Sequence, residues 1–564
     1  MNFKKKNLYF IIFIFSPLLT IAFLANFSFV DTSNYFFKTL LSGKLFYMYS
    51  ADWPYYNPIL HENRFQPFVG IFQNIILFFD LYKNQKSIYL VQLIIFLTSL
   101  VFIIKTVNKN IIFTYLVFFT FILSPPFIFS FVQPLLTETT LIFFISIYIF
   151  LLKKIFSKVS VISAILIITL IPIIILSKIS SVILLLSINF FLIYFSFKSR
   201  NKLYLFFFIF CFIFSLLIYF LLISYTGKAQ DKFYNPKVFF FYYIKTDFIL
   251  IFIYFICITS LKYKYNSYKN ITFQNSLFIS LLLTSIIYFV ALIIFGKHSE
   301  YQQVICYLLV IPYLVNLNLD KKYFTNHRVV FATLLICLLV KGSFYKIILF
   351  FFFISLFLYI LKIFFSTLNN NYIVSLLISL SLFYLIIPGI SLSYHRFIIG
   401  KNIENAINNL DQTKINSFTQ IFLHSTNNSH CSETIMHNFI FNERLSFLLK
   451  KDYILFANPI NNFDDCKIDL EYFERNYSSV NIYAFQNYKY KNIKNEPDLI
   501  ISNYYDDKNN LYNFLLMNNI NPEKYELSQY QHNQAWNIYY KIISKISSFR
   551  INSPIVFLLK KIDN

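Results

Sequence analysis

Apolar runs long enough to cross a membrane recur from the N-terminus to about Leu392, separated by short polar breaks that contain lysine. A transmembrane helix needs about 20 predominantly apolar residues. The stretch Val329–Phe364 holds one span or two, so the pattern predicts about 12 or 13 spans in all. The predicted spans are about Leu8–Val30, Ser87–Ile104, Ile111–Pro125, Glu138–Leu152, Val159–Leu176, Ser180–Phe197, Leu203–Ser224, Asp247–Leu261, Ser276–Phe295, Gln303–Val315, Val329–Val340, Ser343–Phe364 and Tyr372–Leu392.

The pattern changes near residue 394, where the chain becomes rich in Asn, Asp, Lys and Tyr. Short strand-like runs then alternate with helical patterns, which is typical of a small α/β domain. We therefore predict a transmembrane domain at residues 1–393 and a soluble α/β domain at residues 394–564. The strand-like runs are Thr419–Leu423, Tyr453–Ala457, Val480–Phe485 and Asp498–Ser502, and the helical patterns are Glu443–Leu449 and Asn509–Met517.

Composition excludes an ordinary soluble protein. Hydrophobic residues make up 57% of the chain and charged residues 13%, whereas soluble domains are about 45–50% apolar and about 25% charged. The net charge of +23 is explained by basic loops that fix topology at the cytoplasmic face. Because the basic residues are scattered between apolar spans and form no patch, we do not expect a nucleic acid partner.

The lysines and arginines predict the orientation of the spans. Lys4, Lys5 and Lys6 precede the first span, which indicates an uncleaved anchor with its N-terminus in the cytoplasm. The first loop, residues 30–86, and the C-terminal domain are then extracytoplasmic, in a multi-pass protein of a bacterial inner or plasma membrane. The predicted cytoplasmic loops hold Lys105, Lys109, Lys153, Lys154, Lys158, Lys198, Arg200, Lys202, Lys262, Lys264, Lys269, Lys321, Lys322 and Arg328.

The first loop is the longest early polar break. It starts with Asp31 at the end of the first span and also carries Arg64. The apolar segment Pro67–Tyr82 that follows is too short to span comfortably, so we predict a helix that lies at the outer interface or re-enters it. If this segment spans instead, every later orientation inverts. Asp52 and Glu62 lie in the same loop, but nothing else in the chain requires them.

Ionisable residues at membrane depth are functional candidates, because burying a charge at the centre of a span costs about 2.5–3.5 kcal/mol. Asp31 and Glu138 begin or end spans, Lys178 divides two apolar runs, and His298 lies in the loop before the tenth predicted span. Singly, each also fits an interfacial polar residue or a snorkelling lysine. Together with Arg64 they fall on one side of the predicted topology. Two carboxylates could act as a base or hold a divalent metal, and the basic groups could bind a phosphate.

The C-terminal domain carries no motif of comparable strength. His424, His430, Cys431 and His437 lie near one another in sequence, but their spacing matches no zinc pattern and fits surface polar residues. Cys431 and Cys466 could pair as a disulfide if the domain is extracytoplasmic, or remain two free thiols.

This order of features resembles the GT-C superfamily of polytopic membrane glycosyltransferases, which includes mannosyltransferases and aminoarabinose transferases that use polyprenyl-phosphate-linked sugars. The segment from Asp31 is similar to the acidic motif that follows the family's first span, and Arg64-Phe65-Gln66-Pro67-Phe68 to the segment that ends its first loop. The segment Pro126–Glu138 resembles the family's proline-containing loop before an acidic residue. Ile175-Leu176-Ser177-Lys178 resembles its basic position between the fifth and sixth spans.

The chain departs from the family pattern at two points. Thr32 follows Asp31, where many members have a second acidic residue. Glu300-Tyr301 stands before the tenth span, where many have Arg-Tyr. The signature of asparagine-glycosylating members, two tryptophans followed by Asp, Tyr and Gly, is absent.

The resemblance implies transfer of a sugar from a polyprenyl phosphate to an envelope acceptor outside the cytoplasm. In this hypothesis Asp31 is the general base, and Glu138 positions the acceptor or a metal. Arg64, Lys178 and His298 bind the donor phosphate.

Other functions remain open. A transporter or flippase for a lipid-linked saccharide would also need intramembrane charges, although the chain shows no repeated broken spans. An envelope polysaccharide polymerase or ligase would share the lipid-linked substrate, and a structural membrane protein with a sensing C-terminal domain is the fourth alternative.

Overall fold

The structure is a computed structural model of the 564-residue chain. It describes residues 10–24, 71–79, 81, 85–107, 111–132, 137–157, 160–226, 250–251, 253–254, 257–258, 261, 273–294, 300–316, 402, 405, 421–424, 455–456, 498–502, 507–517, 520–530 and 555–562. The predicted spans Val329–Val340, Ser343–Phe364 and Tyr372–Leu392 lie outside these residues, as do Val480–Phe485, Glu443–Leu449, His430, Cys431, His437 and Cys466.

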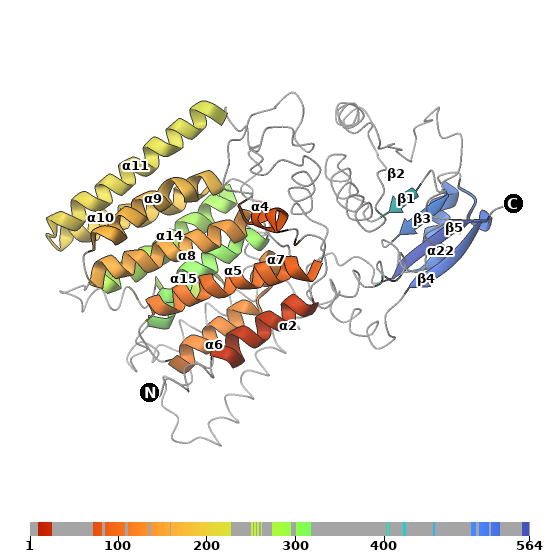
Figure 1. The fold of residues 1–564 in the computed structure, drawn as a ribbon, viewed down its shortest axis with the longest axis horizontal. Helices are drawn as coiled ribbons and strands as arrows, with labels where there is room; N and C mark the ends of the chain where they lie inside the picture. Colours follow the sequence, from red (N-terminus) through yellow and green to blue (C-terminus); the bar gives the residue numbers. More distant parts are fainter. Residues whose placement is uncertain are drawn as a thin grey trace, which may run out of the picture.

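The N-terminal part is a bundle of apolar helices (Figure 1). Among the described residues, five helices are long and apolar enough to cross a membrane, which makes this a multi-pass membrane protein as predicted. The helices are η1 (Ile11–Phe15), α2 (Ser16–Leu24), α4 (Ile71–Phe78), α5 (Gln85–Thr106), α6 (Ile111–Ile122), α7 (Pro125–Val132), α8 (Thr137–Ser157), α9 (Val161–Ser177), α10 (Ser181–Lys198), α11 (Lys202–Thr226), α14 (Phe273–Ile294) and α15 (Glu300–Asn316). The five long ones are α5, α8, α10, α11 and α14.

Hydrogen bonds between helix ends show in which directions the helices run relative to one another. Lys86 at the start of α5 donates to the backbone oxygen of Phe23 at the end of α2, over 2.6 Å. Lys153 near the end of α8 donates to the backbone oxygen of Thr106 at the end of α5. Therefore α5 and α8 run in the same direction, antiparallel to α2. The starts of α5 and α8 share one end of the bundle with the end of α2, as the predicted alternation of spans requires.

The segment around Pro125 differs from the sequence prediction. We predicted a span that ends near Pro125 and a loop that starts at Pro126, and only the end of the span is observed. Helix α6 ends at Ile122, and Pro125 starts the new helix α7. Proline suits a first helical position, because its fixed φ matches the helix and its missing N–H is not needed there. The backbone N–H of Ile128 bonds to the oxygen of Ser124 over 2.9 Å and closes the first turn.

The predicted short helix after the first loop is present as α4, which has 8 residues. Its Ile76 is buried against Ile88 and Ile95 of α5, and Phe72 packs edge-on against Phe143 of α8 at 5.4 Å between ring centroids. At about 1.5 Å per residue, a helix of this length cannot cross a bilayer. The described part of this segment therefore fits the non-spanning prediction.

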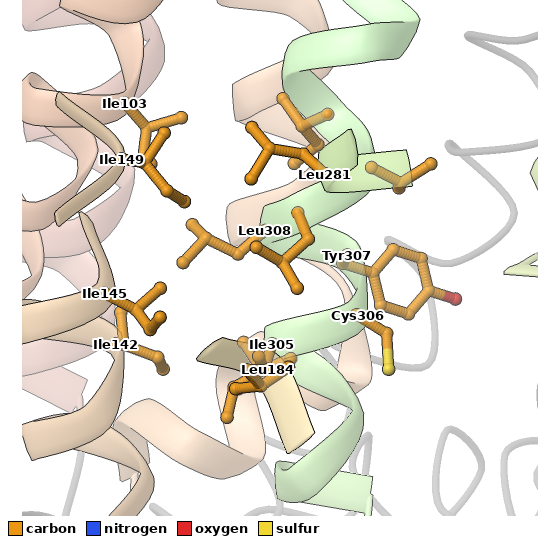
Figure 2. Packing of buried hydrophobic residues seen from close by; sticks show 14 of the residues in the cluster. Ile103, Ile142, Ile145, Ile149, Leu184, Leu281, Ile305, Cys306, Tyr307 and Leu308 are labelled. Atoms are coloured by element: carbon orange, nitrogen blue, oxygen red, sulfur yellow. The ribbon is translucent and has the colours of Figure 1, made fainter. Parts of the chain in front are cut away.

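The core of the bundle is made of branched aliphatic and aromatic side chains. Figure 2 shows Leu308 of α15 pointing towards Ile145 and Ile149 of α8, while Cys306 and Tyr307 point to another side of α15. Helix α15 thus contacts different neighbours with different faces. One polar pair inside this core joins two helices: Tyr148 of α8 donates to Asn189 Oδ1 of α10 over 3.1 Å.

The C-terminal part contains a five-stranded mixed sheet in the order β2-β1-β3-β5-β4. Strand β1 is parallel to β2 and β3, while β5 is antiparallel to β3 and β4. In the register, Phe422 lies beside Ile500 and Ile500 beside Leu559. The strands are β1 (Ile421–His424), β2 (Leu455–Phe456), β3 (Leu499–Ser502), β4 (Tyr525–Tyr530) and β5 (Val556–Lys561).

Helix α22 (Lys508–Met517) contributes Leu511, Phe514 and Leu515 to the core on this sheet. Three strands and α22 lie where the sequence predicts them, so the α/β class is confirmed. The sequence analysis missed β4 and β5. Strand β4 is polar, as edge strands often are, and β5 is a short continuous apolar run that ends in two lysines, so neither gives a clear alternating pattern.

We expect Tyr148→Phe to destabilise the bundle. The substitution leaves the buried Asn189 Oδ1 without its donor, and an unsatisfied buried acceptor costs about 1–3 kcal/mol. The midpoint of thermal unfolding of the purified protein should fall. Tyr219→Phe is the control, because the Tyr219 hydroxyl makes no hydrogen bond to the described residues. Equal midpoints for the two variants would contradict the importance of the Tyr148–Asn189 bond.

Candidate functional site

Glu138 and Lys178 meet at one end of the helix bundle. Glu138 lies in the first turn of α8, where the helix dipole favours a carboxylate. Lys178 is the residue that follows the last turn of α9, where the dipole favours a cation. The Lys178 ammonium forms a salt bridge with Glu138 Oε1. The ends of two neighbouring antiparallel helices thus bring together residues that lie 40 positions apart in the sequence.

The backbone around Lys178 is held by local hydrogen bonds. The hydroxyls of Ser177 and Ser181 both donate to the backbone oxygen of Ile174, over 2.8 and 2.9 Å. Lys178 has an extended backbone, with φ −159° and ψ 117°, and its N–H also bonds to the Ile174 oxygen. The turn from α9 to α10 therefore leaves helical geometry at Lys178, and this turn places the lysine beside the start of α8.

The pair is buried on one side only. The side chain of Glu138 is 1% exposed and that of Lys178 is 16% exposed. A carboxylate so deeply buried needs a partner, because an unpaired buried charge costs several kcal/mol. Lys178 supplies the opposite charge and keeps part of its side chain accessible. An ammonium has three donors, so Lys178 can hold Glu138 and still offer a hydrogen bond to a ligand.

Neutral polar groups surround the pair. Thr139, next to Glu138, accepts a hydrogen bond at Oγ1 from Gln92 Nε2 of α5 over 3.1 Å. The same amide donates to the backbone oxygen of Ser130 at the end of α7, over 3.2 Å. Tyr288 of α14 directs its hydroxyl towards Ser180 and lies within electrostatic range of Glu138. The ends of α7, α9 and α14 and the starts of α5, α8 and α10 therefore meet at this site.

The structure brings together two of the five residues that the sequence singles out. Asp31, Arg64 and His298 lie outside the described residues, so their roles remain predictions. Glu138 and Lys178 were predicted on the same side of the membrane, and the ion pair places them in direct contact. Their chemical roles also remain predictions.

The described residues do not fit a divalent metal. They contain no group of three His, Cys, Asp or Glu side chains that could hold one. Glu138 contributes a single carboxylate that Lys178 already neutralises, and the ammonium would repel a cation. Asp31 lies outside the described residues, so a metal held by Asp31 and Glu138 stays a prediction.

Sequence reasoning missed Gln92, Ser180 and Tyr288, because it searched for ionisable groups. Gln92 carries a signal that such reasoning could use, since it is the only strong polar side chain in the run Ile88–Phe96 and is fully buried. Tyr288 carries no such signal in a chain with 44 tyrosines.

Comparison with known proteins gives one structural likeness. No protein-family model matches the chain, and no curated protein matches it. The fold is similar to the crystal structure of ArnT from Cupriavidus metallidurans bound to undecaprenyl phosphate, with 10% sequence identity over 98% of each chain and a TM-score of 0.48. At this identity and TM-score, the likeness does not establish the family or the activity of the chain.

We expect the removal of one charge of the ion pair to destabilise the protein more than the removal of both charges. Lys178→Met leaves the Glu138 carboxyl buried without its cation and should destabilise the protein by about 3–5 kcal/mol. The double variant Glu138→Gln/Lys178→Met removes both charges and should recover most of that loss. Thermal unfolding of the purified variants measures both effects. A single variant as stable as the double variant would show that the two charges do not depend on each other.

Proposed function

We propose that this protein is a membrane glycosyltransferase that moves a sugar from a polyprenyl-phosphate donor to an envelope acceptor at the bundle end that holds Glu138 and Lys178. The observation that carries the proposal is the buried Glu138–Lys178 pair. Ionisable groups at membrane depth mark substrate or ion sites by default. The likeness of the sequence motifs to the GT-C superfamily supports glycosyl transfer as the reaction.

The chemistry requires positive charge at the leaving group. An acceptor hydroxyl or amine attacks the anomeric carbon, the bond from this carbon to the phosphate oxygen breaks, and polyprenyl phosphate leaves. The acceptor proton passes to a base, for which Asp31 is the candidate. The phosphate needs no acid, because it leaves as an anion that cations stabilise.

The pair alone cannot neutralise a phosphate. Glu138 and Lys178 together carry no net charge, so a bound lipid phosphate requires further cations. Arg64 and His298 are the candidates, and the planar guanidinium of Arg64 suits two phosphate oxygens at once. Lys178 would add one hydrogen bond to the phosphate through a donor that Glu138 does not occupy. Glu138 would then hold Lys178 in place and orient the acceptor.

A transporter or flippase for a lipid-linked saccharide is the second candidate. The same ion pair favours it, because intramembrane charges also serve transport. The two functions differ in one observable, the formation of a new glycosidic bond.

We expect Asp31→Asn to abolish transfer by the purified protein. A general base typically contributes about 10²–10⁴-fold to the rate, so the variant should lose at least about 100-fold in activity while its membrane expression is unchanged. The assay follows a radiolabelled sugar from synthetic polyprenyl phosphoryl hexose or pentose into an extract of envelope glycolipids and glycans. Asp52→Asn, in the same loop, is the matched control and should retain activity.

Two results would contradict this proposal. Wild-type activity in Asp31→Asn would remove Asp31 as the base. Movement of the labelled lipid between the leaflets of reconstituted vesicles, with no label in a new glycosidic bond, would replace the transferase with the transporter.

A further inference from the structure

Tyr288 has a buried hydroxyl that makes no well-formed hydrogen bond to any described residue. Its side chain is 1% exposed. The hydroxyl faces Ser180 at the start of α10 and interacts electrostatically with Glu138. Neither Tyr288 Oη nor Ser180 Oγ has a hydrogen-bond partner of acceptable geometry in the described part of the chain. Two neutral polar oxygens therefore lie unsatisfied beside the ion pair.

Three other buried tyrosines of the bundle have hydroxyls that are hydrogen-bonded. The hydroxyl of Tyr148 bonds to Asn189 Oδ1 over 3.1 Å, and that of Tyr254 bonds to Ser285 Oγ over 2.7 Å. Tyr204 donates to the backbone oxygen of Ile155 over 3.0 Å. These hydroxyls are used to hold neighbouring helices together. Tyr288, at the Glu138 end, is not used in this way.

The start of α15 carries a second unsatisfied group. The side chain of Gln303 is 1% exposed, and neither its Nε2 nor its Oε1 has a hydrogen-bond partner among the described residues. Gln303 lies one turn before Cys306 on the same side of α15, and Cys306 interacts electrostatically with Tyr288. Gln303 is therefore placed at the same bundle end as Tyr288, on the helix packed against α14.

Such groups point to a neutral ligand rich in hydroxyls. A buried polar group without a partner is costly, so native proteins satisfy nearly all of them with protein, water or ligand. A tyrosine hydroxyl, a serine hydroxyl and an amide each donate and accept, as the hydroxyls of a sugar do. None of the three carries charge, which Glu138 and Lys178 supply close by.

We propose that Tyr288, Ser180 and Gln303 form a subsite that binds the hydroxyl groups of the donor sugar next to the ion pair. The subsite rests on the proposed function, because that function places the sugar phosphate at Lys178. Its role is to distinguish a sugar-bearing lipid phosphate from the sugar-free lipid phosphate that remains after transfer.

The test compares the binding of two lipids to the full-length protein in lipid nanodiscs, since sugar-based detergents would compete. The probes are polyprenyl phosphate and the same lipid carrying a hexose or a pentose. Wild-type protein should bind one of the sugar-bearing lipids more tightly than the sugar-free lipid. Tyr288→Phe and Gln303→Leu should each weaken binding of that lipid by about tenfold, the cost of one lost buried hydrogen bond at the upper end of its range. Binding of the sugar-free lipid should not change.

The thermal stability of the ligand-free variants tests whether these residues have a structural role instead. Tyr288→Phe and Gln303→Leu remove groups that have no hydrogen-bond partner among the described residues, so neither should lower the midpoint of thermal unfolding. Tyr148→Phe is the matched control, because it removes a tyrosine hydroxyl that is bonded within the bundle. It should lower the midpoint and leave the ratio of the two lipid affinities unchanged.

Three results would overturn the proposal. If wild-type protein binds the sugar-bearing and sugar-free lipids equally, or if both variants keep the wild-type ratio, the subsite is wrong and the proposed function stands. If wild-type protein binds neither lipid phosphate, the proposed function fails and the subsite fails with it.

Discussion

The burial of the Glu138 carboxylate is the constraint on which the architecture of this bundle end depends. A carboxylate that is 1% exposed cannot remain charged in an apolar bundle without a cation in contact with it. Lys178 can reach it only if α9 ends where it does and if the chain turns before α10 begins. The serines on either side of Lys178 hold that turn by bonding to the Ile174 oxygen. One electrostatic requirement therefore sets where three helices begin or end.

Buried polar groups in the bundle differ in how far the fold satisfies them. Several are used for cohesion, as in the bond from Tyr148 to Asn189 or the chain from Tyr254 through Ser285 to the backbone oxygen of Cys306. Tyr288 and Gln303 keep hydrogen-bonding capacity that no described residue uses. Stability alone would favour apolar side chains at these two positions, because an unpaired buried polar group destabilises the fold. Their presence is therefore better explained by binding than by folding.

The sequence predicted the helices well and their mutual contacts poorly, for a physical reason. A span is a local property, because its length and apolar character can be read from consecutive residues. Helix α10 thus differs from its prediction by one residue at each end. Which charges meet depends on how helices rotate and pack, and hydropathy carries no such information. Glu138 and Lys178 were found as charges in apolar surroundings, but nothing in the sequence said that they touch.

The same reason explains the residues that were missed. Tyr288 is one of 44 tyrosines, and only the neighbours of its hydroxyl distinguish it. Helix α7 was missed because two adjacent prolines suggest a loop, although proline at a first helical position starts a helix. Strand β5 pairs with β3 and β4, which lie 54 and 26 residues or more before it, so no hairpin signal precedes it. In each case the deciding interaction is nonlocal.

Under the proposed function, a neutral ion pair suits phosphate departure better than an isolated lysine would. The phosphodiester of a lipid-phosphate sugar carries one negative charge, and the leaving phosphate monoester gains a second as the glycosidic bond breaks. A group that binds both states equally lowers the energy of the substrate as much as that of the transition state, and it gains no rate. Lys178 is held by Glu138, so under the proposed function its attraction to the donor would be partly offset before the reaction. As charge develops on the phosphate, the ammonium would shift its hydrogen bonding towards the stronger anion. The counter-charge of Glu138 would thereby bias Lys178 towards the transition state, which is the difference in binding that catalysis requires.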